Sequence, residues 1–297
     1  MTETVNDIAY HLESLGEDGA GPTLLMLHGF MGSGACFDHL GSDLASFCRP
    51  VTLDLLGHGR TEGPAEPDRY RCGRQVADLR EIVRRLDRKP LYLYGYSMGG
   101  RLALQYALEH PETLKGLVLE SAHPGLEDEN ERERRRREDE ERAAAIEEDF
   151  DAFLQRWEEL ELFEVPSPIS PAGEGGEPGN SPRRPDPKRY QRYAAIQRSQ
   201  RPACMAASLR GFGSGAMPPA WDRLEGFGLP VLALAGEHDP KYRGIAANLN
   251  RLLPYNRVDI VPQAAHRVHL DQPFYLLKLI TAFLTNHEDH EHGLDHR

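Results

Sequence analysis

Short, largely apolar runs recur along the chain, and most of them end at a glycine or a polar residue. Runs of this length are typical of strands that are buried on both faces of a sheet. Helical periodicity over 74–86 and 275–284 predicts helices that pack against that sheet. We therefore expect an α/β fold with a mostly parallel, doubly wound sheet. The predicted strands are 24–28, 51–55, 90–94, 116–120, 231–235 and 258–261.

The regular alternation of strand and helix patterns stops after residue 120 and resumes at 231. Residues 127–149 are mostly charged. Opposite charges four residues apart, Glu131 with Arg135 and Glu133 with Arg137, favour a solvent-exposed helix there. Because ligands bind beyond the carboxyl ends of parallel strands, we expect the inserted segment to form a lid over an active site.

The predicted organisation is a core in two parts with the lid between them. The core covers 1–126 and 221–286, and it begins with an antiparallel edge hairpin around residues 8–15. The lid covers 127–220, is helical again over 189–220 and contains a flexible Pro-, Gly- and Ser-rich loop at 165–188. Residues 287–297 form a polar, histidine-rich tail. A metal site is one interpretation of that tail, but a disordered segment is favoured because nothing fixes the ligand geometry.

Charge and composition narrow the classes of partner. The formal net charge of −12 argues against nonspecific binding to nucleic acid or to an anionic membrane. No apolar stretch has the length of a membrane span, and the first residues lack the basic region of a secretion signal. The scattered cysteines suit reduced thiols without metal-ligand spacing, so we expect a cytoplasmic protein with no metal and no cofactor. These cysteines are Cys36, Cys48, Cys72 and Cys204.

The strongest chemical signal is Gly95-Tyr-Ser-Met-Gly99, which directly follows the predicted strand 90–94. A strand that runs through Gly-x-Ser-x-Gly into a helix is typical of a nucleophile elbow. The two glycines allow close contact with neighbouring backbone, and Ser97 is raised above the edge of the sheet. The amide of Met98 then lies at a helix N-terminus, where it can stabilise negative charge on an oxygen.

An activated serine needs a histidine as base and an acid that orients the histidine. After an elbow of this kind the expected chain order is serine, acid, histidine. Asp239 follows the strand 231–235 and is the favoured acid, with Glu237 in reserve. His266 comes first after the last strand and is the favoured base. His269, three residues later, is the alternative, although it can also cap or pack.

Two further groups complete the expected site. The loop after the strand 24–28 places the Phe30 amide where it can pair with the Met98 amide in an oxyanion hole. Arg101 lies four residues after Ser97, close to the expected mouth of the site. Together with arginines of the lid, it favours an anionic, polycarboxylate substrate. For any single lid arginine, a surface ion pair with a nearby glutamate is the simpler interpretation.

With these motifs the chain resembles the 2-succinyl-6-hydroxy-2,4-cyclohexadiene-1-carboxylate synthases of menaquinone biosynthesis, a family of lyases with the α/β-hydrolase fold. The resemblance covers nearly the whole chain. The elbow and triad are shared by the entire superfamily, whereas Tyr96, Arg101 and the run 122–126 before an arginine-rich lid narrow the match. The matching stretches are 27–34, 95–103, 117–126, 207–215, Trp221 and 236–242.

The resemblance implies that pyruvate is eliminated from a cyclohexene that bears succinyl, carboxylate and enolpyruvyl groups. Ser97, activated by His266 and Asp239, would act as the base, and the Phe30 and Met98 amides would hold the charge on the succinyl carbonyl oxygen. The implied substrate-binding residues are Tyr96, Arg101, Arg135, Trp157 and Arg198. Three of these have alternatives: Arg132, Arg134 or Arg136 for Arg135, Arg201 for Arg198, and a packing role for Trp157.

Two other functions compete with this lyase. A serine carboxylester or carbon–carbon bond hydrolase of the same fold uses the same triad to attack a carbonyl covalently. A non-enzymatic binding protein can also keep the fold, since a fold alone does not establish function. The complete set of Ser97, Asp239 and His266 disfavours the binding protein.

Overall fold

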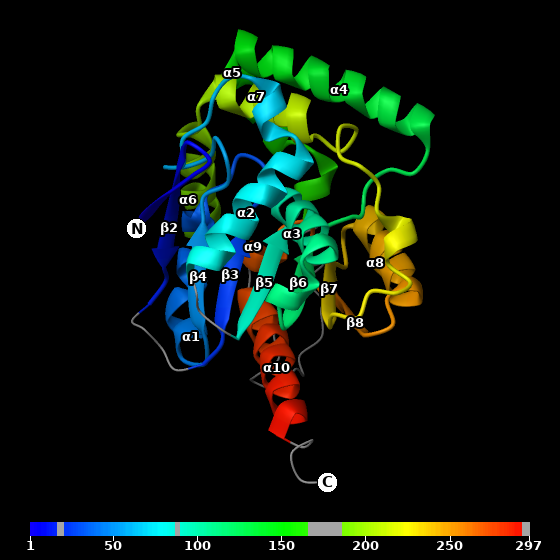
Figure 1. The fold of residues 1–297 in the computed structure, drawn as a ribbon. Helices are drawn as coiled ribbons and strands as arrows, with labels where there is room; N and C mark the ends of the chain where they lie inside the picture. The colour runs from blue at the N-terminus through cyan, green and yellow to red at the C-terminus, as the bar shows by residue number, and fades with distance from the viewer. Residues whose placement is uncertain (17–20, 87–89, 166–185, 293–297) are drawn as a thin grey trace, which may run out of the picture.

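The computed structural model describes residues 1–16, 21–86, 90–165 and 186–292. Its centre is an eight-stranded sheet in the order β1-β2-β4-β3-β5-β6-β7-β8 (Figure 1). The strands from β3 to β8 run parallel, whereas β1 and β2 are antiparallel at one edge. The strands are β1 (Thr2–Val5), β2 (Ile8–Ser14), β3 (Thr23–Leu27), β4 (Arg49–Leu53), β5 (Leu91–Tyr96), β6 (Gly116–Glu120), β7 (Val231–Gly236) and β8 (Asn256–Val261). The predicted fold class and edge hairpin are therefore confirmed.

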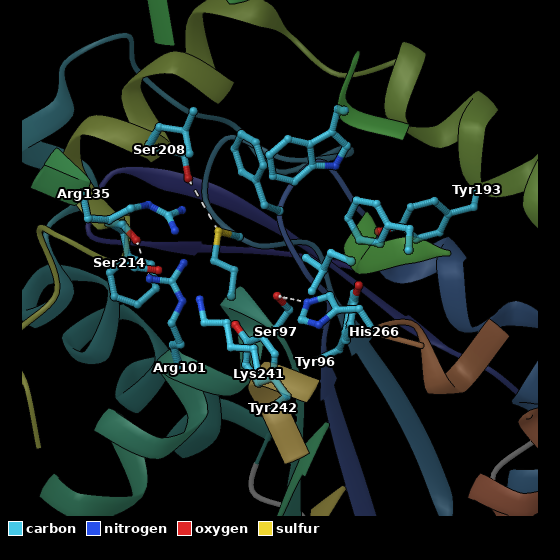
Figure 2. A pocket seen from close by; sticks show the side chains of 18 residues that line it. Tyr96, Ser97, Arg101, Arg135, Tyr193, Ser208, Ser214, Lys241, Tyr242 and His266 are labelled. Carbon is cyan, nitrogen blue, oxygen red and sulfur yellow. Dashed lines mark hydrogen bonds between the residues drawn. The ribbon is translucent and has the colours of Figure 1, made fainter. Parts of the chain in front are cut away.

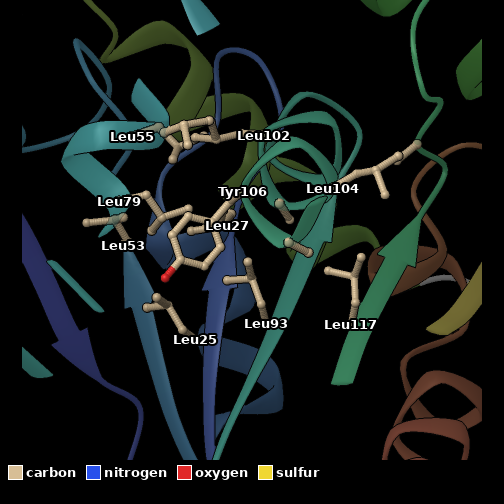
Figure 3. Packing of buried hydrophobic residues seen from close by; sticks show 14 of the residues in the cluster. Leu25, Leu27, Leu53, Leu55, Leu79, Leu93, Leu102, Leu104, Tyr106 and Leu117 are labelled. Carbon is tan, nitrogen blue, oxygen red and sulfur yellow. The ribbon is translucent and has the colours of Figure 1, made fainter. Parts of the chain in front are cut away.

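Helices cover both faces of the sheet because alternate strand residues point to opposite sides. Leu25 and Leu93 belong to one apolar cluster with Leu79 and Tyr106 of the helices on that face (Figure 3). Their chain neighbours, such as Tyr92, belong to the cluster on the other face. The first face carries α2 (Cys72–Leu86), α3 (Met98–Glu109) and α8 (Pro240–Leu252), and the second carries α1 (Gly41–Ala45) and α10 (Pro273–His292).

In the described part of the chain between β6 and β7 there are four α-helices, and Figure 1 shows α4 lying across the end of the molecule opposite α10. They are α4 (Glu129–Glu148), α5 (Phe150–Glu158), α6 (Pro187–Arg198) and α7 (Pro202–Phe212). Shorter helical turns are α9 (Val268–Asp271) and the 3-10 segments Gly34–Leu40, Pro67–Tyr70, Pro111–Thr113, Glu161–Phe163 and Trp221–Arg223.

The helix α4 is mostly exposed, as its charge pattern predicts. The side chain of Asp128 caps its N-terminus by accepting a hydrogen bond from the Glu131 amide. Ala143 and Ile146 form its apolar contact with α5 and α7. Of the two predicted ion pairs, only Glu133 with Arg137 forms, with 3.5 Å between N and O.

Arg135 differs from that expectation. Its Nε atom donates to Oδ1 of the buried Asp139 at 2.8 Å, so its side chain lies toward the inner face of α4 rather than beside Glu131. Glu131 and Asp139 each lie one helical turn from Arg135, and Arg135 bonds to Asp139, which is buried within the lid.

Several expectations concern the ends and loops of the chain. The Pro/Gly-rich loop predicted at 165–188 lies almost wholly outside the described residues. The prediction of a disordered tail is wrong for the backbone of residues 287–292. The helix α10 begins with apolar turns at Pro273 and continues to His292. The four cysteines are free and buried. In the described part of the chain, no helix has the length and apolar content needed to span a bilayer, and no cluster of His, Cys, Asp or Glu is arranged to hold a metal ion.

Candidate active site

Ser97 occupies a sharp turn between β5 and α3. Its backbone has φ 50° and ψ −109°, a strained conformation for a residue with a side chain. The flanking glycines make the turn possible. A Cβ atom at Gly95 would lie 2.5 Å from the Gly100 Cα, and one at Gly99 would lie 2.4 Å from the Leu27 carbonyl oxygen. The predicted elbow geometry is therefore present at the carboxyl end of the sheet.

The structure brings together the three residues expected to form a triad. The Ser97 hydroxyl donates to His266 Nε2 at 3.0 Å (Figure 2). His266 Nδ1 donates to Asp239 Oδ2 at 2.8 Å. His266 and Asp239 are 3% and 1% exposed. The other oxygen of Asp239 accepts from the Tyr242 amide at 3.1 Å, so the carboxylate is also the N-cap of α8.

Burial lowers the pKa of His266, and its hydrogen bond to Asp239 opposes that shift. The imidazole is therefore neutral at pH 7, with Nε2 available to accept a proton from Ser97. This arrangement can activate a hydroxyl either as a nucleophile or as a base.

The two alternatives to these residues lie elsewhere. Glu237 is exposed, and its Oε2 accepts from the Gln263 amide at 2.9 Å. His269 is fully buried, and its Nδ1 donates to Glu120 Oε1 at 2.8 Å. Neither Glu237 nor His269 lines the pocket around Ser97.

Phe30 and Met98, the expected oxyanion-hole residues, both line the pocket that contains Ser97. Met98 is the first residue of α3, so its amide lies at the positive end of the helix dipole. Phe30 follows β3, and its ring packs at 5.6 Å from Trp157 and 6.0 Å from His58, measured between ring centroids. These contacts hold the loop that carries the Phe30 amide beside the elbow.

The pocket has cations on one side of Ser97 and aromatic rings on the other. Arg101, Arg135 and Lys241 lie together to one side, whereas Tyr193 lies beyond His266 (Figure 2). The ring of Trp157 also lines the pocket, where it contacts Phe30 and is stacked on Phe153 at 5.7 Å. The remaining lining residues are Tyr96, Leu162, Phe163, Ser208, Leu209, Phe212, Gly213, Ser214 and Tyr242.

The three cations differ in their burial and in their hydrogen-bond and ion-pair partners. Arg101 is buried and donates to the Phe212 carbonyl at 3.0 Å, and burial lowers its pKa to about 10. Arg135 is paired with Asp139. Lys241 lines this pocket and a neighbouring one, and its partial burial and the Arg135 charge lower its pKa. The nearby Asp239 carboxylate opposes this lowering of the Lys241 pKa.

The structure departs from the sequence expectation at Arg198. This residue is exposed at the end of α6 and does not line the pocket. The third cation is Lys241, which sequence reasoning did not single out. A signal was present, because Lys241 follows Asp239 by two residues at the start of a helix that begins at the site. Tyr193, Ser208, Ser214 and Tyr242 were also missed as lining residues.

Comparison with known proteins agrees with this geometry. Residues 22–273 match the family model for the alpha/beta hydrolase fold. A Bacillus subtilis relative assigned to 2-succinyl-6-hydroxy-2,4-cyclohexadiene-1-carboxylate synthase is 36% identical over 95% of this chain and 97% of its own. The synthase of that name from Enterobacter sp. is 29% identical over 85% and 87%.

A solved structure and a second kind of relative complete the comparison. The structure of MenH from S. aureus superposes with a TM-score of 0.82 at 27% identity, and the match covers 94% of this chain and 98% of that one. A 2-(acetamidomethylene)succinate hydrolase from Mesorhizobium japonicum is 28% identical over 90% of both chains. The chain belongs to the alpha/beta hydrolase fold and, within it, to the 2-succinyl-6-hydroxy-2,4-cyclohexadiene-1-carboxylate synthase family.

Proposed function

We propose that this protein is a carbon–oxygen lyase of menaquinone biosynthesis. It eliminates pyruvate from 2-succinyl-5-enolpyruvyl-6-hydroxy-3-cyclohexene-1-carboxylate and forms 2-succinyl-6-hydroxy-2,4-cyclohexadiene-1-carboxylate. The observation that carries the proposal is one pocket in which the hydrogen-bonded Ser97 and His266 meet Arg101, Arg135 and Lys241. The names of relatives that match nearly the full chain give the product, and the three cations suit the three carboxylates of the proposed substrate.

In the proposed reaction Ser97 acts as the base. Its hydroxyl proton passes to His266 Nε2 while Ser97 Oγ takes the proton from the ring carbon that bears the succinyl group. The electron pair moves onto the succinyl carbonyl oxygen, where the amides of Phe30 and Met98 donate hydrogen bonds to it. Asp239 keeps His266 in the required tautomer and stabilises the imidazolium.

The second half of the reaction returns that electron pair to the ring. A double bond forms to the carbon that lost its proton, the ring double bond moves by one position, and the carbon–oxygen bond to the enolpyruvyl group breaks. The enolate of pyruvate leaves and takes up one proton, which balances the proton that the His266 imidazolium gives up as it returns to the neutral state. No water is consumed. The proposed roles of Arg101, Arg135 and Lys241 are to hold carboxylates, and that of Tyr96 and Trp157 is to contact the ring.

The test uses the purified protein and the cyclohexene substrate. Pyruvate, measured with lactate dehydrogenase, is expected to appear in equal amount to the conjugated diene, which absorbs in the ultraviolet. The Arg198→Met variant should release pyruvate as the wild type does, because this lid arginine lies outside the pocket. Absence of pyruvate with the wild-type protein contradicts the proposal.

A serine hydrolase of carboxylesters or carbon–carbon bonds is the second candidate, because the 3.0 Å contact between Ser97 and His266 also suits nucleophilic attack. The relative named a 2-(acetamidomethylene)succinate hydrolase shows that hydrolases occur among the similar chains. A burst of p-nitrophenol from p-nitrophenyl esters, with an acyl group trapped on Ser97, would favour this candidate. Slow turnover without a burst favours the lyase.

A further inference from the structure

Glu120, the last residue of β6, contacts both the elbow and the histidine loop. Its backbone carbonyl accepts a hydrogen bond from the Ser97 amide at 2.8 Å. Its carboxylate Oε1 accepts from the His269 amide at 3.1 Å and from His269 Nδ1 at 2.8 Å. His269 lies only three residues after His266, so one residue links the turn that carries Ser97 to the loop that carries His266.

The hydrogen bonds define the protonation of this buried pair. Both side chains are completely buried, and the second carboxylate oxygen of Glu120 accepts from the Tyr94 hydroxyl. Glu120 therefore accepts at both oxygens, as a carboxylate does. His269 Nε2 is buried without a hydrogen-bond partner in the described residues. The contact with the Glu120 carboxylate places a proton on His269 Nδ1.

The pair is in contact with the reacting groups through Tyr96. The Tyr96 ring lies 4.6 Å from the ring of His269 and 5.5 Å from that of His266, measured between centroids. Phe37 packs on the far side of His269 at 5.3 Å. A displacement of His269 would therefore move Tyr96 and the His266 loop together, because packed side chains transmit such shifts.

Other titratable groups surround both histidines. Asp239, Arg267, Tyr96 and Tyr242 face His266. Tyr94, Cys36, His39 and Asp271 lie around Glu120 and His269. Burial raises the pKa of Tyr94, Tyr96 and Cys36, which keeps these three groups neutral. Glu120, which accepts hydrogen bonds at both carboxylate oxygens, opposes the lowering of the His266 pKa by burial.

We propose that Glu120 and His269 are positioning residues that hold the His266 loop in register with Ser97. The proposal rests on the function proposed above, in which His266 receives the Ser97 proton. Neither residue lines the pocket, so both act through His266 rather than on the substrate. Misplacement of reacting groups by about 1 Å lowers rates by roughly 100-fold, which sets the size of the expected effect.

The test compares two variants that separate geometry from charge. His269→Phe keeps a ring among Phe37, Tyr96 and Tyr193 but removes the Nδ1 hydrogen bond. Glu120→Gln keeps an acceptor oxygen for His269 and removes the charge. Labelling of Ser97 by a fluorophosphonate reports activation of the serine without the cyclohexene substrate, and it is measured across pH. His110→Phe, at the end of α3 and outside the pocket, is the matched control.

For His269→Phe we expect the labelling rate and kcat to fall about 10- to 100-fold while KM changes less than about twofold. For Glu120→Gln we expect the acidic limb of the labelling profile to move to lower pH, because loss of a negative charge disfavours protonated His266. His110→Phe is expected to match the wild type.

Wild-type labelling and kcat in folded His269→Phe would overturn the proposal, as would an unchanged pH profile in Glu120→Gln. If His269→Phe does not fold, the Glu120→Gln profile decides the question. A wild-type protein that labels normally but releases no pyruvate contradicts the lyase function and leaves this test valid.

Discussion

Arg267 and Glu158 join the loop after His266 to the lid helix α5. Arg267 donates to both carboxylate oxygens of Glu158, at 2.9 and 2.7 Å. Arg267 is 3% exposed, and its guanidinium carbon lies 3.7 Å from the Phe163 ring centroid and 4.5 Å from that of Tyr193. The His266 amide also donates to the Leu162 carbonyl at 3.2 Å. The lid and the histidine loop are therefore one connected unit.

The two partners of this ion pair are expected to respond differently to substitution. Glu158→Gln leaves the buried Arg267 without an anionic partner, and we expect a loss of about 2 kcal/mol in the free energy of unfolding. Arg267→Met places an apolar chain among Phe163 and Tyr193 and leaves Glu158 free to be hydrated, so the expected loss is below about 1 kcal/mol. Urea denaturation measures both. Equal losses in the two variants would show that the unpaired charge of buried Arg267 does not determine the cost of breaking the ion pair.

Removal of the Ser97 hydroxyl is expected to lower kcat for pyruvate release by at least about 100-fold. The pocket walls are unchanged in Ser97→Ala, so KM should remain within about threefold. Steady-state kinetics with a coupled pyruvate assay measures both values. Retention of more than a tenth of the activity in Ser97→Ala would remove this serine from the mechanism.

Lys241 is expected to bind a substrate carboxylate although sequence reasoning did not identify it. Lys241→Met should lower kcat/KM about 10- to 100-fold, the effect of losing one charge-assisted hydrogen bond. Arg198→Met is the matched control and should change kcat/KM by less than about twofold, because Arg198 is exposed outside the pocket. The opposite ranking of the two variants would place the third cation on α6.

Two buried histidines make the stability of the fold sensitive to pH. Burial lowers the pKa of His28 to about 4 and that of His58 to about 3, from about 6.5 in an unfolded chain. At pH values between the native and the unfolded pKa, the unfolded chain binds more protons than the native one. The free energy of unfolding therefore falls as the pH falls below 6.5. The protons of His28 and His58 together contribute about 2.5 kcal/mol per pH unit between pH 5.5 and 4.5.

Chemical denaturation at several pH values tests this linkage. His58→Gln should lower the slope by about 1.4 kcal/mol per pH unit, because one proton is removed from the difference between the two states. A free energy of unfolding that stays constant from pH 6.5 to 4.5 would contradict the account of both histidines.

Much of the fold was predictable because its signals are local. Each buried strand is a short apolar run, and the elbow needs glycine at fixed positions around Ser97. The chain order of Asp239 and His266 follows from the order of the strands that precede them. These features depend on sequence neighbours and topology, which a single sequence displays.

The side chains of the lid were harder to place because their direction depends on tertiary packing. The charged run of α4 does not show that Arg135 is the arginine that lies toward Asp139 and the pocket. Arg198 and Lys241 have the same charge, and only the packing of α6 and α8 decides which one reaches the pocket. The choice between His266 and His269 depends on Glu120, which is distant in the sequence.

The most direct measurement is a single turnover of substrate that carries deuterium on the ring carbon bearing the succinyl group. The account predicts one pyruvate and one conjugated diene per substrate, a slower rate with deuterium than with hydrogen, and no release by Ser97→Ala. Consumption of the substrate without pyruvate, or an acyl group left on Ser97, would contradict it.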